Sequence, residues 1–183
     1  DVSFATLAQC ILDGEPPTGR VIAGVQPPLD TLQLPYDEYT EEDIRQRHLY
    51  VEASRGCPFK CEFCLSALDQ TAWPFPLDPF LAALERLYQR GARQFKFVDR
   101  TFNLKVDTSL AVLDFFLSKI DLHPQDPPFA HFELIPDHLP ERLKGAIARF
   151  PPGTLQFEIG IQTFDPAVQK RISRRQKNAV AED

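Results

Sequence analysis

Hydrophobic and polar positions alternate in two ways between residues 49 and 176. Short runs with a period of two, typical of β-strands, are separated by stretches whose apolar residues recur every three or four positions, which indicates amphipathic helices. This rhythm predicts four strand–helix units of a parallel sheet. The expected strands span 49–54, 93–99, 130–135 and 155–162, and the expected helices span 77–91, 108–120, 139–150 and 165–176.

Two of the expected helices carry clear end signals. Asp78 is the expected N-cap of the first helix, and Gly91 its C-terminal stop. In the last helix, Asp165 is the expected N-cap and Pro166 the first helical residue. These signals support helices rather than loops between the strands.

One face of each expected strand is polar, although parallel strands covered by helices on both sides are usually apolar throughout. Helices therefore cover the apolar face only, and charges on the other face need partners or a ligand. We expect a curved sheet with a polar inner surface. An antiparallel sheet with one wet face is the alternative, but the intervening helices argue against it. The polar positions are Tyr50, Glu52, Ser54, Lys96, Arg100, His131, Glu133, Gln156, Glu158, Gly160 and Gln162.

The segment before residue 49 differs in composition. Residues 3–13 have a helical pattern, and residues 14–39 are rich in proline, which removes backbone donors and favours extended shapes. We expect residues 1–48 to form a helix remnant and a proline-rich linker, and residues 49–183 to form the α/β domain. The chain contains no methionine, which suggests a piece of a longer protein.

The bulk composition is that of a soluble globular protein, with 43% hydrophobic and 25% charged residues. No run is long and apolar enough for a membrane span, and the first residues do not resemble a signal peptide, so we expect a cytoplasmic protein with no membrane partner. A net charge of −6 offers no general attraction to nucleic acid. The only basic cluster is residues 170–177.

Three of the four cysteines, Cys57, Cys61 and Cys64, lie within eight residues. Structural zinc sites usually have four protein ligands, and disulfides are disfavoured in a cytoplasmic chain. Thiolates also bind iron–sulfur clusters, and three cysteines on a four-iron cluster leave one iron open for another ligand. Two alternatives stay open: a zinc site completed by His131 or water, and an electron-transfer protein without a substrate. Cys10 is interpreted as a buried small hydrophobic residue.

The Cys-x3-Cys-x2-Cys spacing at the end of the first strand, with an aromatic residue before the last cysteine, resembles the signature of radical S-adenosylmethionine enzymes. The segments "FVDRTFN" and "EIGIQTFDPAVQKRISRRQ" are similar to the branch that often carries an N-terminal cobalamin-binding domain. The resemblance covers about residues 49–177. It implies a partial (β/α) barrel, with about four of the six βα units of the radical domain present here. Cobalamin would then belong to the full-length protein, upstream of this fragment.

The resemblance also implies an activity. The three cysteines would hold a [4Fe-4S] cluster whose open iron binds S-adenosylmethionine, and a reductant such as flavodoxin or ferredoxin would supply an electron. Reductive cleavage would then yield methionine and a 5′-deoxyadenosyl radical, which modifies a substrate that the sequence does not name. The alternative is a zinc-binding or structural module that uses the same cysteines without catalysis.

Five further residues match cofactor-binding positions of the family. The resemblance places Phe63 beside the adenine and Glu133 at the ribose hydroxyls. Asp99 stands where the family often has a Gly-Gly-Glu motif for the methionine amino group, a motif that this sequence lacks. Gln162 and Arg174 resemble a pair that touches the cofactor, with Arg174 at its carboxylate.

Other interpretations stay open for several of these residues. Phe63 is also compatible with a core position, and Asp99 with a cap at the end of its strand. Arg174, expected within the last helix, is also compatible with a solvated helix face. His131 and Glu158 are further candidates for contacts on the inner surface, with a satisfied structural histidine as the other interpretation of His131.

Overall fold

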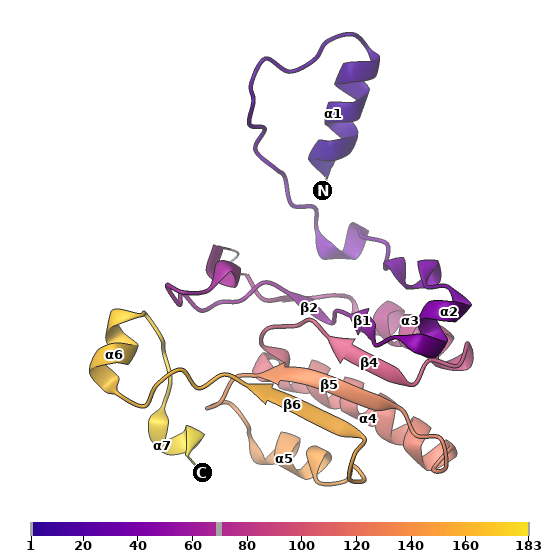
Figure 1. The fold of residues 1–183 in the computed structure, drawn as a ribbon, viewed down its shortest axis with the longest axis vertical. Coiled ribbons are helices and arrows are strands. Elements are labelled where there is room, and N and C mark those ends of the chain that lie inside the picture. Colours follow the sequence, from indigo (N-terminus) through magenta and orange to yellow (C-terminus); the bar gives the residue numbers. More distant parts are fainter. Residues whose placement is uncertain (1, 69–70, 183) are drawn as a thin grey trace. The chain divides into compact units, whose positions relative to one another are not determined.

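The structure, a computed structural model, describes residues 2–68 and 71–182, and the chain divides into two compact units, residues 1–33 and 34–183. The smaller unit holds helix α1 (Val2–Leu12), which confirms the predicted N-terminal helix, and a short 3-10 helix, η1 (Leu29–Thr31). The larger unit holds the sheet and the remaining elements (Figure 1). Among the described helices, none has the length and apolar character required to cross a membrane.

Four strands of the larger unit form a parallel sheet in the order β1-β4-β5-β6. The four predicted strand–helix units are therefore confirmed, and the antiparallel alternative is wrong. The strands are β1 (Leu49–Val51), β4 (Gln94–Phe97), β5 (Phe129–Leu134) and β6 (Leu155–Ile159), and the helices that follow them are α3 (Leu77–Gln89), α4 (Val106–Leu122), α5 (Glu141–Ile147) and α6 (Pro166–Arg171).

The strand order follows the sequence, as in β/α barrels and unlike doubly wound sheets. Crossovers between parallel strands are right-handed, so helices lie on one face of the sheet when each new strand is added at the same edge. Figure 1 shows α3, α4 and α5 on the same side of the sheet. In the described part of the chain the strands form an open sheet with β1 and β6 at its edges. The predicted α/β class is therefore confirmed, but these four strands do not close into a barrel.

The core lies between the sheet and these helices and is dominated by phenylalanine. Phe132 on β5 stacks on Phe102 with ring centroids 4.0 Å apart and lies 4.4 Å from Phe97 on β4. Phe116 of α4 packs edge-on against Phe95 and Phe97. The opposite face carries mainly polar side chains that are exposed or partly exposed, as predicted, among them Lys96, His131, Glu133, Gln156 and Glu158.

The last strand departs partly from the predicted pattern. Leu155 and Phe157 pack against the core as expected, but Ile159 and Ile161 are exposed. The reason is the position of β6 at the sheet edge, since the short α6 does not cover its carboxyl end.

Helix ends agree with the sequence signals at three of four positions. Gly91 adopts φ 99°, beyond the end of α3, and Asp165 accepts hydrogen bonds from the backbone N–H groups of Ala167 and Val168. Pro166 is the first residue of α6, as predicted. The N-cap assignment of Asp78 is wrong: α3 begins at Leu77, with Pro76 at the N-cap position, so the Asp78 carboxylate lies inside the first turn, where the helix dipole still favours it.

The predicted first strand breaks after Val51. Its continuation, β2 (Ser54–Arg55), pairs instead with β3 (Trp73–Pro74) in a small antiparallel sheet. The cysteine segment and the 3-10 helix η3 (Leu65–Leu68) lie in the sequence between these two short strands. The larger unit also contains η4 (Phe102–Leu104) after β4 and α7 (Asn178–Ala181) near the C-terminus.

Residues 34–48, which the composition assigns to the linker, pack on the sheet unit. They form η2 (Pro35–Glu38) and α2 (Glu41–Gln46). The Tyr36 hydroxyl accepts from the backbone N–H of Glu52 at 2.8 Å, and the Tyr39 hydroxyl accepts from that of Tyr50 at 3.0 Å. These hydroxyls occupy backbone groups at the edge of β1, which protects the sheet from pairing with another strand.

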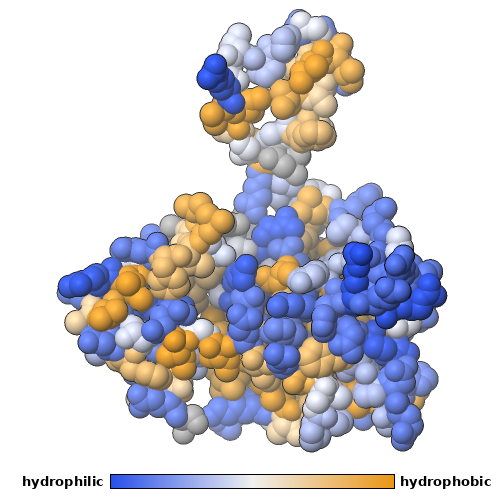
Figure 2. All heavy atoms as spheres, viewed as in Figure 1, coloured by the Kyte–Doolittle hydropathy of each residue, from blue (hydrophilic) through white to orange (hydrophobic). Residues whose placement is uncertain are grey.

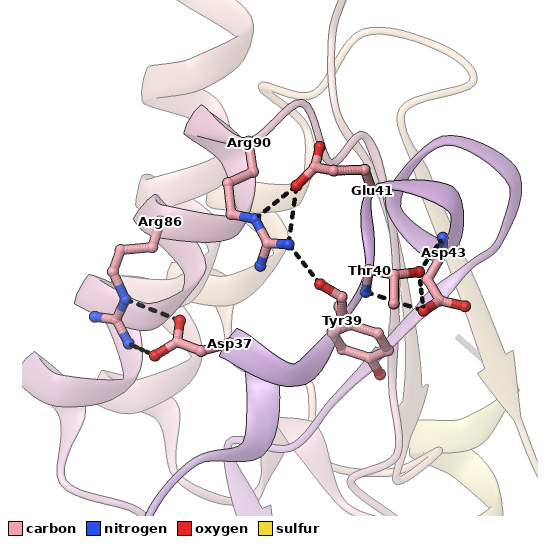
Figure 3. Close-up of polar contacts among 7 residues, drawn as sticks. All are labelled: Asp37, Tyr39, Thr40, Glu41, Asp43, Arg86 and Arg90. Carbon is pink, nitrogen blue, oxygen red and sulfur yellow. Dashed lines mark hydrogen bonds and ion pairs between the residues drawn. The ribbon is translucent and has the colours of Figure 1, made fainter.

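Ion pairs to α3 hold the same segment (Figure 3). Arg86 pairs with Asp37 at 3.2 Å, and Arg90 pairs with Glu41 at 3.0 Å while donating to the Tyr39 carbonyl. Thr40 and Asp43, also drawn there, form a capping box at the start of α2. The segment therefore belongs to the compact unit and supports β1, the strand that leads to the cysteines.

Candidate functional site

A cavity of about 400 Å³ opens at the carboxyl ends of β4, β5 and β6, next to the cysteine segment. This is the edge of a parallel sheet at which barrel enzymes place their ligands. The cavity brings together all three clustered cysteines and four of the five other candidate residues. Its wall consists of Cys57, Phe59, Cys61, Phe63, Cys64, Leu65, Ser66, Arg100, Thr101, Glu133, Leu134, Ile135, Glu158, Gly160, Gln162, Arg174 and Arg175.

The three cysteines are free thiols that line this cavity, with Cys57 and Cys61 buried and Cys64 partly exposed. Burial raises the pKa of the Cys57 thiol, while the positive charge of Arg174 acts in the opposite direction. Gly56 precedes the first cysteine with φ 90°, and a Cβ atom there would lie 2.3 Å from the Thr71 carbonyl oxygen. The turn into the cysteine segment therefore requires glycine at position 56.

The residues after α6 are hydrogen-bonded to the cysteine segment. The helix ends at Arg171, and Ser173 follows with φ 55°, a left-handed conformation that is uncommon for residues other than glycine. The backbone N–H of Glu62 donates to the Ile172 carbonyl at 3.1 Å, and the Ser173 hydroxyl lies 2.9 Å from the Glu62 carboxylate. Two segments more than a hundred residues apart in sequence thus share a hydrogen-bonded junction.

Arg174 lies just beyond this turn, which corrects its expected position within the last helix. Left-handed Ser173 redirects the chain, and the backbone N–H of Arg174 bonds back to the Gln169 carbonyl at 2.9 Å. Its guanidinium Nη2 donates to the Gly160 carbonyl at 2.6 Å, and Nη1 lies 3.7 Å from Cys61 Sγ. The buried Nε has no hydrogen-bond partner among the described residues. Arg174 therefore links β6 to the cysteines and is not a solvated helix residue.

Glu133 lines the cavity at the end of β5, where Nη1 of Arg100 contacts both of its carboxylate oxygens at 2.9 and 3.0 Å. The hydrogen bond to Glu133 raises the pKa of Arg100. Glu133 is thus placed as the sequence predicts, although an arginine already occupies its oxygens. Its contact with a ribose remains a prediction, since a ligand would have to share or displace Arg100.

Of the five further cofactor-binding candidates, Asp99 is the one that does not line the cavity. It is 1% exposed, and its carboxylate accepts from the Ala53 backbone N–H at 2.9 Å and from the Ser54 hydroxyl at 2.6 Å. These contacts fit the alternative interpretation, in which Asp99 caps the end of its strand. They tie the carboxyl end of β4 to the residues after β1, which lead into the cysteine segment.

Burial raises the pKa of Asp99 from 3.8 to about 6, with hydrogen bonds from Ser54 and Ala53 acting against it. The folded state therefore binds this proton more tightly than the unfolded chain, and the contribution of Asp99 to stability falls as the pH rises from about 4 to 6. We expect Asp99→Asn to remove this fall, so that its free energy of unfolding gains about 2 to 3 kcal/mol relative to the wild type between pH 4 and pH 7.5.

Urea unfolding of both proteins at the two pH values measures this difference. The exposed Asp78→Asn variant is the control, and its difference from the wild type is expected to change far less with pH. An equal change in both variants would show that the buried carboxyl of Asp99 is not its source.

Phe63 and Gln162 both line the cavity and are exposed. For Phe63, the exposed fraction of 55% excludes the core interpretation. Figure 2 shows hydrophobic side chains among hydrophilic ones on the side of the larger unit that carries α6, whereas the side over α2 and α3 is mainly hydrophilic. Leu65, Leu68 and Trp73, close to Phe63 in sequence, are exposed as well. An exposed aromatic ring at the cavity wall is available to a flat ligand.

Of the weaker candidates, Glu158 lines the cavity and His131 does not. His131 Nε2 lies 3.7 Å from Glu158 and is buried without a hydrogen-bond partner among the described residues. Burial lowers the pKa of His131, so this contact is not an ion pair at neutral pH. Whether His131 is a structural histidine or contacts a ligand remains a prediction. Cys10 belongs to the other unit and is partly exposed rather than buried.

Sequence reasoning missed three residues of the site. Asn103 is buried and clamps the residues after β5, with its amide accepting from the Ile135 backbone N–H at 2.8 Å and donating to two carbonyls. Thr101 lines the cavity, is 4% exposed and leaves its hydroxyl without a partner among the described residues. Arg175 also lines it. The signal for the first two was their position directly after a strand whose carboxyl end was expected at the site.

A single metal ion and a multi-iron cluster require different separations of the three cysteine sulfur atoms. Within residues 2–68 and 71–182, no three side chains of His, Cys, Asp or Glu are placed to hold one metal ion. A tetrahedral zinc ion with Zn–S bonds of about 2.3 Å needs its sulfur ligands within about 4 Å of one another. In a cluster, different cysteines bind different irons, so the sulfurs stand further apart. The three thiols line the same cavity as Thr101, whose hydroxyl has no partner among the described residues.

No protein-family model and no curated protein matches this sequence. The structure is similar to two solved structures of TsrM, a radical S-adenosylmethionine methyltransferase from Kitasatospora setae. One holds a tryptophan substrate and the S-adenosylmethionine analogue aza-SAM, and the other holds cobalamin and a [4Fe-4S] cluster. Each has a TM-score of 0.57 and 17% sequence identity and covers 70% of this chain.

The match covers only 24% and 23% of the TsrM chains, so this chain spans about a quarter of their length. At this level of identity the likeness concerns the fold. It agrees with the α/β architecture described above and with its parallel four-stranded sheet.

Proposed function

We propose that this chain is part of a radical S-adenosylmethionine enzyme, in which Cys57, Cys61 and Cys64 hold a [4Fe-4S] cluster and the adjoining cavity holds S-adenosylmethionine. The observation that carries the proposal is the gathering of these thiols with polar groups from three strand ends around one cavity of about 400 Å³. A three-cysteine set leaves one iron open for a small molecule. The fold likeness to TsrM, whose solved structures hold an S-adenosylmethionine analogue in one case and a [4Fe-4S] cluster in the other, supports the same assignment.

When bound, the cluster would supply one electron that splits the sulfonium of S-adenosylmethionine into methionine and a 5′-deoxyadenosyl radical. The protein provides the surroundings for this step. The three thiols bind as thiolates, and Arg174 offsets their negative charge from its position beside Cys61. The buried Nε of Arg174 and the hydroxyl of Thr101 supply donors that have no partner of their own among the described residues.

The remaining residues of the wall orient the cofactor. Phe63 presents an exposed ring for the adenine, and Glu133 with Arg100 forms a polar wall at the end of β5 suited to hydroxyl groups. Gln162 adds an amide at the end of β6. Asp99 acts indirectly in this scheme, because its hydrogen bonds fix the strand ends rather than the ligand. Cobalamin, a reductant and the substrate to be modified would involve parts of the protein outside this cavity.

Anaerobic reconstitution with iron and sulfide tests the proposal. We expect about four irons per chain, a brown protein, and formation of 5′-deoxyadenosine from S-adenosylmethionine after reduction with dithionite. Stoichiometric zinc with no uptake of iron would instead support a structural zinc module. Uptake of iron without any cleavage of S-adenosylmethionine would favour electron transfer and contradict the enzyme assignment.

A further inference from the structure

A second cavity, of about 530 Å³, adjoins the cysteine cavity. Phe59, Ile135, Arg174 and Arg175 line both of them, so the two spaces share a wall. The proposed function uses only the first space. The second is lined in addition by Leu104, Asp137, His138, Pro166, Gln169, Lys170, Gln176 and Lys177.

The second cavity carries an excess of positive charge. Lys170, Arg174, Arg175 and Lys177 line it, and none of them forms an ion pair with another described residue. Arginines elsewhere in this unit are mostly neutralised. Their partners are Asp37 for Arg86, Glu41 for Arg90, Asp126 for Arg93, Glu133 for Arg100 and Asp114 for Arg149.

A single carboxylate, that of Asp137, faces these four cations in the cavity lining. The Oδ2 atom of Asp137 accepts a hydrogen bond from the Lys177 backbone N–H at 2.8 Å, so part of its hydrogen-bonding capacity is already used. Two buried polar atoms of the lining, Arg174 Nε and Gln176 Oε1, lack a hydrogen-bond partner among the described residues. Lys170, Arg175 and Lys177 are exposed and carry no ion-pair partner among the described residues, so their charges are available to an anionic ligand.

The remaining lining is mixed, with the polar residues His138 and Gln169 beside four apolar ones. Phe59, Leu104, Ile135 and Pro166 contribute hydrophobic surface, and the volume lies in the range of small-molecule sites. A long polyanion would instead need an extended basic groove, and the net charge of −6 opposes its approach. The lining therefore fits a small molecule with an apolar body and a charged end.

We propose that this cavity binds the substrate, a small organic molecule that carries a carboxylate or phosphate group. Lys170, Arg175 and Lys177 hold the anionic end, and Phe59 and Ile135 guide the apolar part toward the cysteine cavity. This inference rests on the proposed function for its role in catalysis. The anion site itself depends only on the positive charges of the cavity lining and can be tested without a cluster or S-adenosylmethionine.

Titration calorimetry of the 183-residue chain with phenyl phosphate, phenylacetate and uncharged benzyl alcohol tests the site. We expect one or both anions to bind at millimolar concentrations and benzyl alcohol to bind more weakly. Lys170→Ala/Lys177→Ala should weaken anion binding roughly tenfold, the loss expected for one or two charge-assisted hydrogen bonds. The stronger of the two anions identifies phosphate or carboxylate as the preferred group.

Arg45→Ala/Arg171→Ala is the matched control, because it removes two exposed positive charges outside both cavities. Equal weakening by the two double variants, equal affinity for benzyl alcohol and the anions, or no anion binding would overturn the proposal. Tighter binding of a single-stranded oligonucleotide than of phenyl phosphate would also overturn it. Iron content and cleavage of S-adenosylmethionine, measured separately on Lys170→Ala/Lys177→Ala, report on the proposed function alone.

Discussion

Replacing Cys61 with alanine is expected to abolish cluster assembly in the proposed enzyme. Cys61 is 4% exposed, lines the cavity and lies beside the guanidinium of Arg174. With two thiolates left, the cluster loses one of three protein ligands, and the iron content after reconstitution should fall from about four per chain to near background. Formation of 5′-deoxyadenosine from S-adenosylmethionine should fall to the level of a protein-free reaction.

Cys10→Ala is the matched control for this experiment, since Cys10 belongs to the other compact unit and is not one of the cavity residues. It should retain the iron content and the activity of the wild type. Circular dichroism checks that both variants are folded. We expect Cys61→Ala to fold, because alanine removes only a small buried group at position 61. Full iron content in Cys61→Ala, or an equal loss in Cys10→Ala, would contradict the assignment of ligands.

The sheet was predictable because its sequence signals are local. The alternation of Phe95 and Phe97 with Lys96 places two apolar side chains on one face and a polar one on the other, and the same pattern recurs in β5. Parallel pairing and helix placement then follow from the spacing of the units and from the right-handedness of crossovers. The cysteine spacing indicated a candidate site for a similar reason, since all three residues lie in one short segment and line one cavity.

Other features depend on contacts between distant residues, which no local pattern reveals. Asp99 follows a strand, as a ligand-binding residue would. Its carboxylate is instead a buried cap, because it accepts hydrogen bonds from the Ala53 backbone N–H and the Ser54 hydroxyl. Arg174 continues a helical pattern in sequence, but the left-handed turn at Ser173, stabilised by Glu62 of the cysteine segment, ends the helix. Residues 34–48 have the composition of a linker, yet Tyr36 is buried against the edge of β1.

The junction between α6 and the cysteine segment leads to the second large effect. Arg174→Ala removes a donor to the Gly160 carbonyl, a positive group beside Cys61 and the unpartnered Nε at the cavity wall. A lost hydrogen bond to a charged group costs about 1.5 to 3 kcal/mol. We expect the charged contacts of Arg174 at the cavity to stabilise the transition state by this amount, so cleavage of S-adenosylmethionine should slow by roughly ten- to a hundredfold in Arg174→Ala.

A second readout separates this role from a merely structural one. Hydrogen bonds to cluster sulfurs and nearby positive charge tune the reduction potential, so Arg174→Ala should shift the potential of the cluster to a more negative value. Arg174→Lys keeps the charge without the planar fork and should lie between the wild type and the alanine variant in both potential and rate. A redox titration followed by electron paramagnetic resonance measures the potentials.

Two neighbours serve as controls because they alter the same turn without touching the guanidinium. Arg171→Ala removes an exposed charge that lines neither cavity, and its potential and rate should match those of the wild type. Ser173→Gly suits the left-handed backbone but loses the hydroxyl contact with Glu62, so it should reduce cluster retention only slightly. If Arg171→Ala shifts the potential as far as Arg174→Ala does, the effect comes from general charge near the site, and the contact between Arg174 and Cys61 does not tune the cluster.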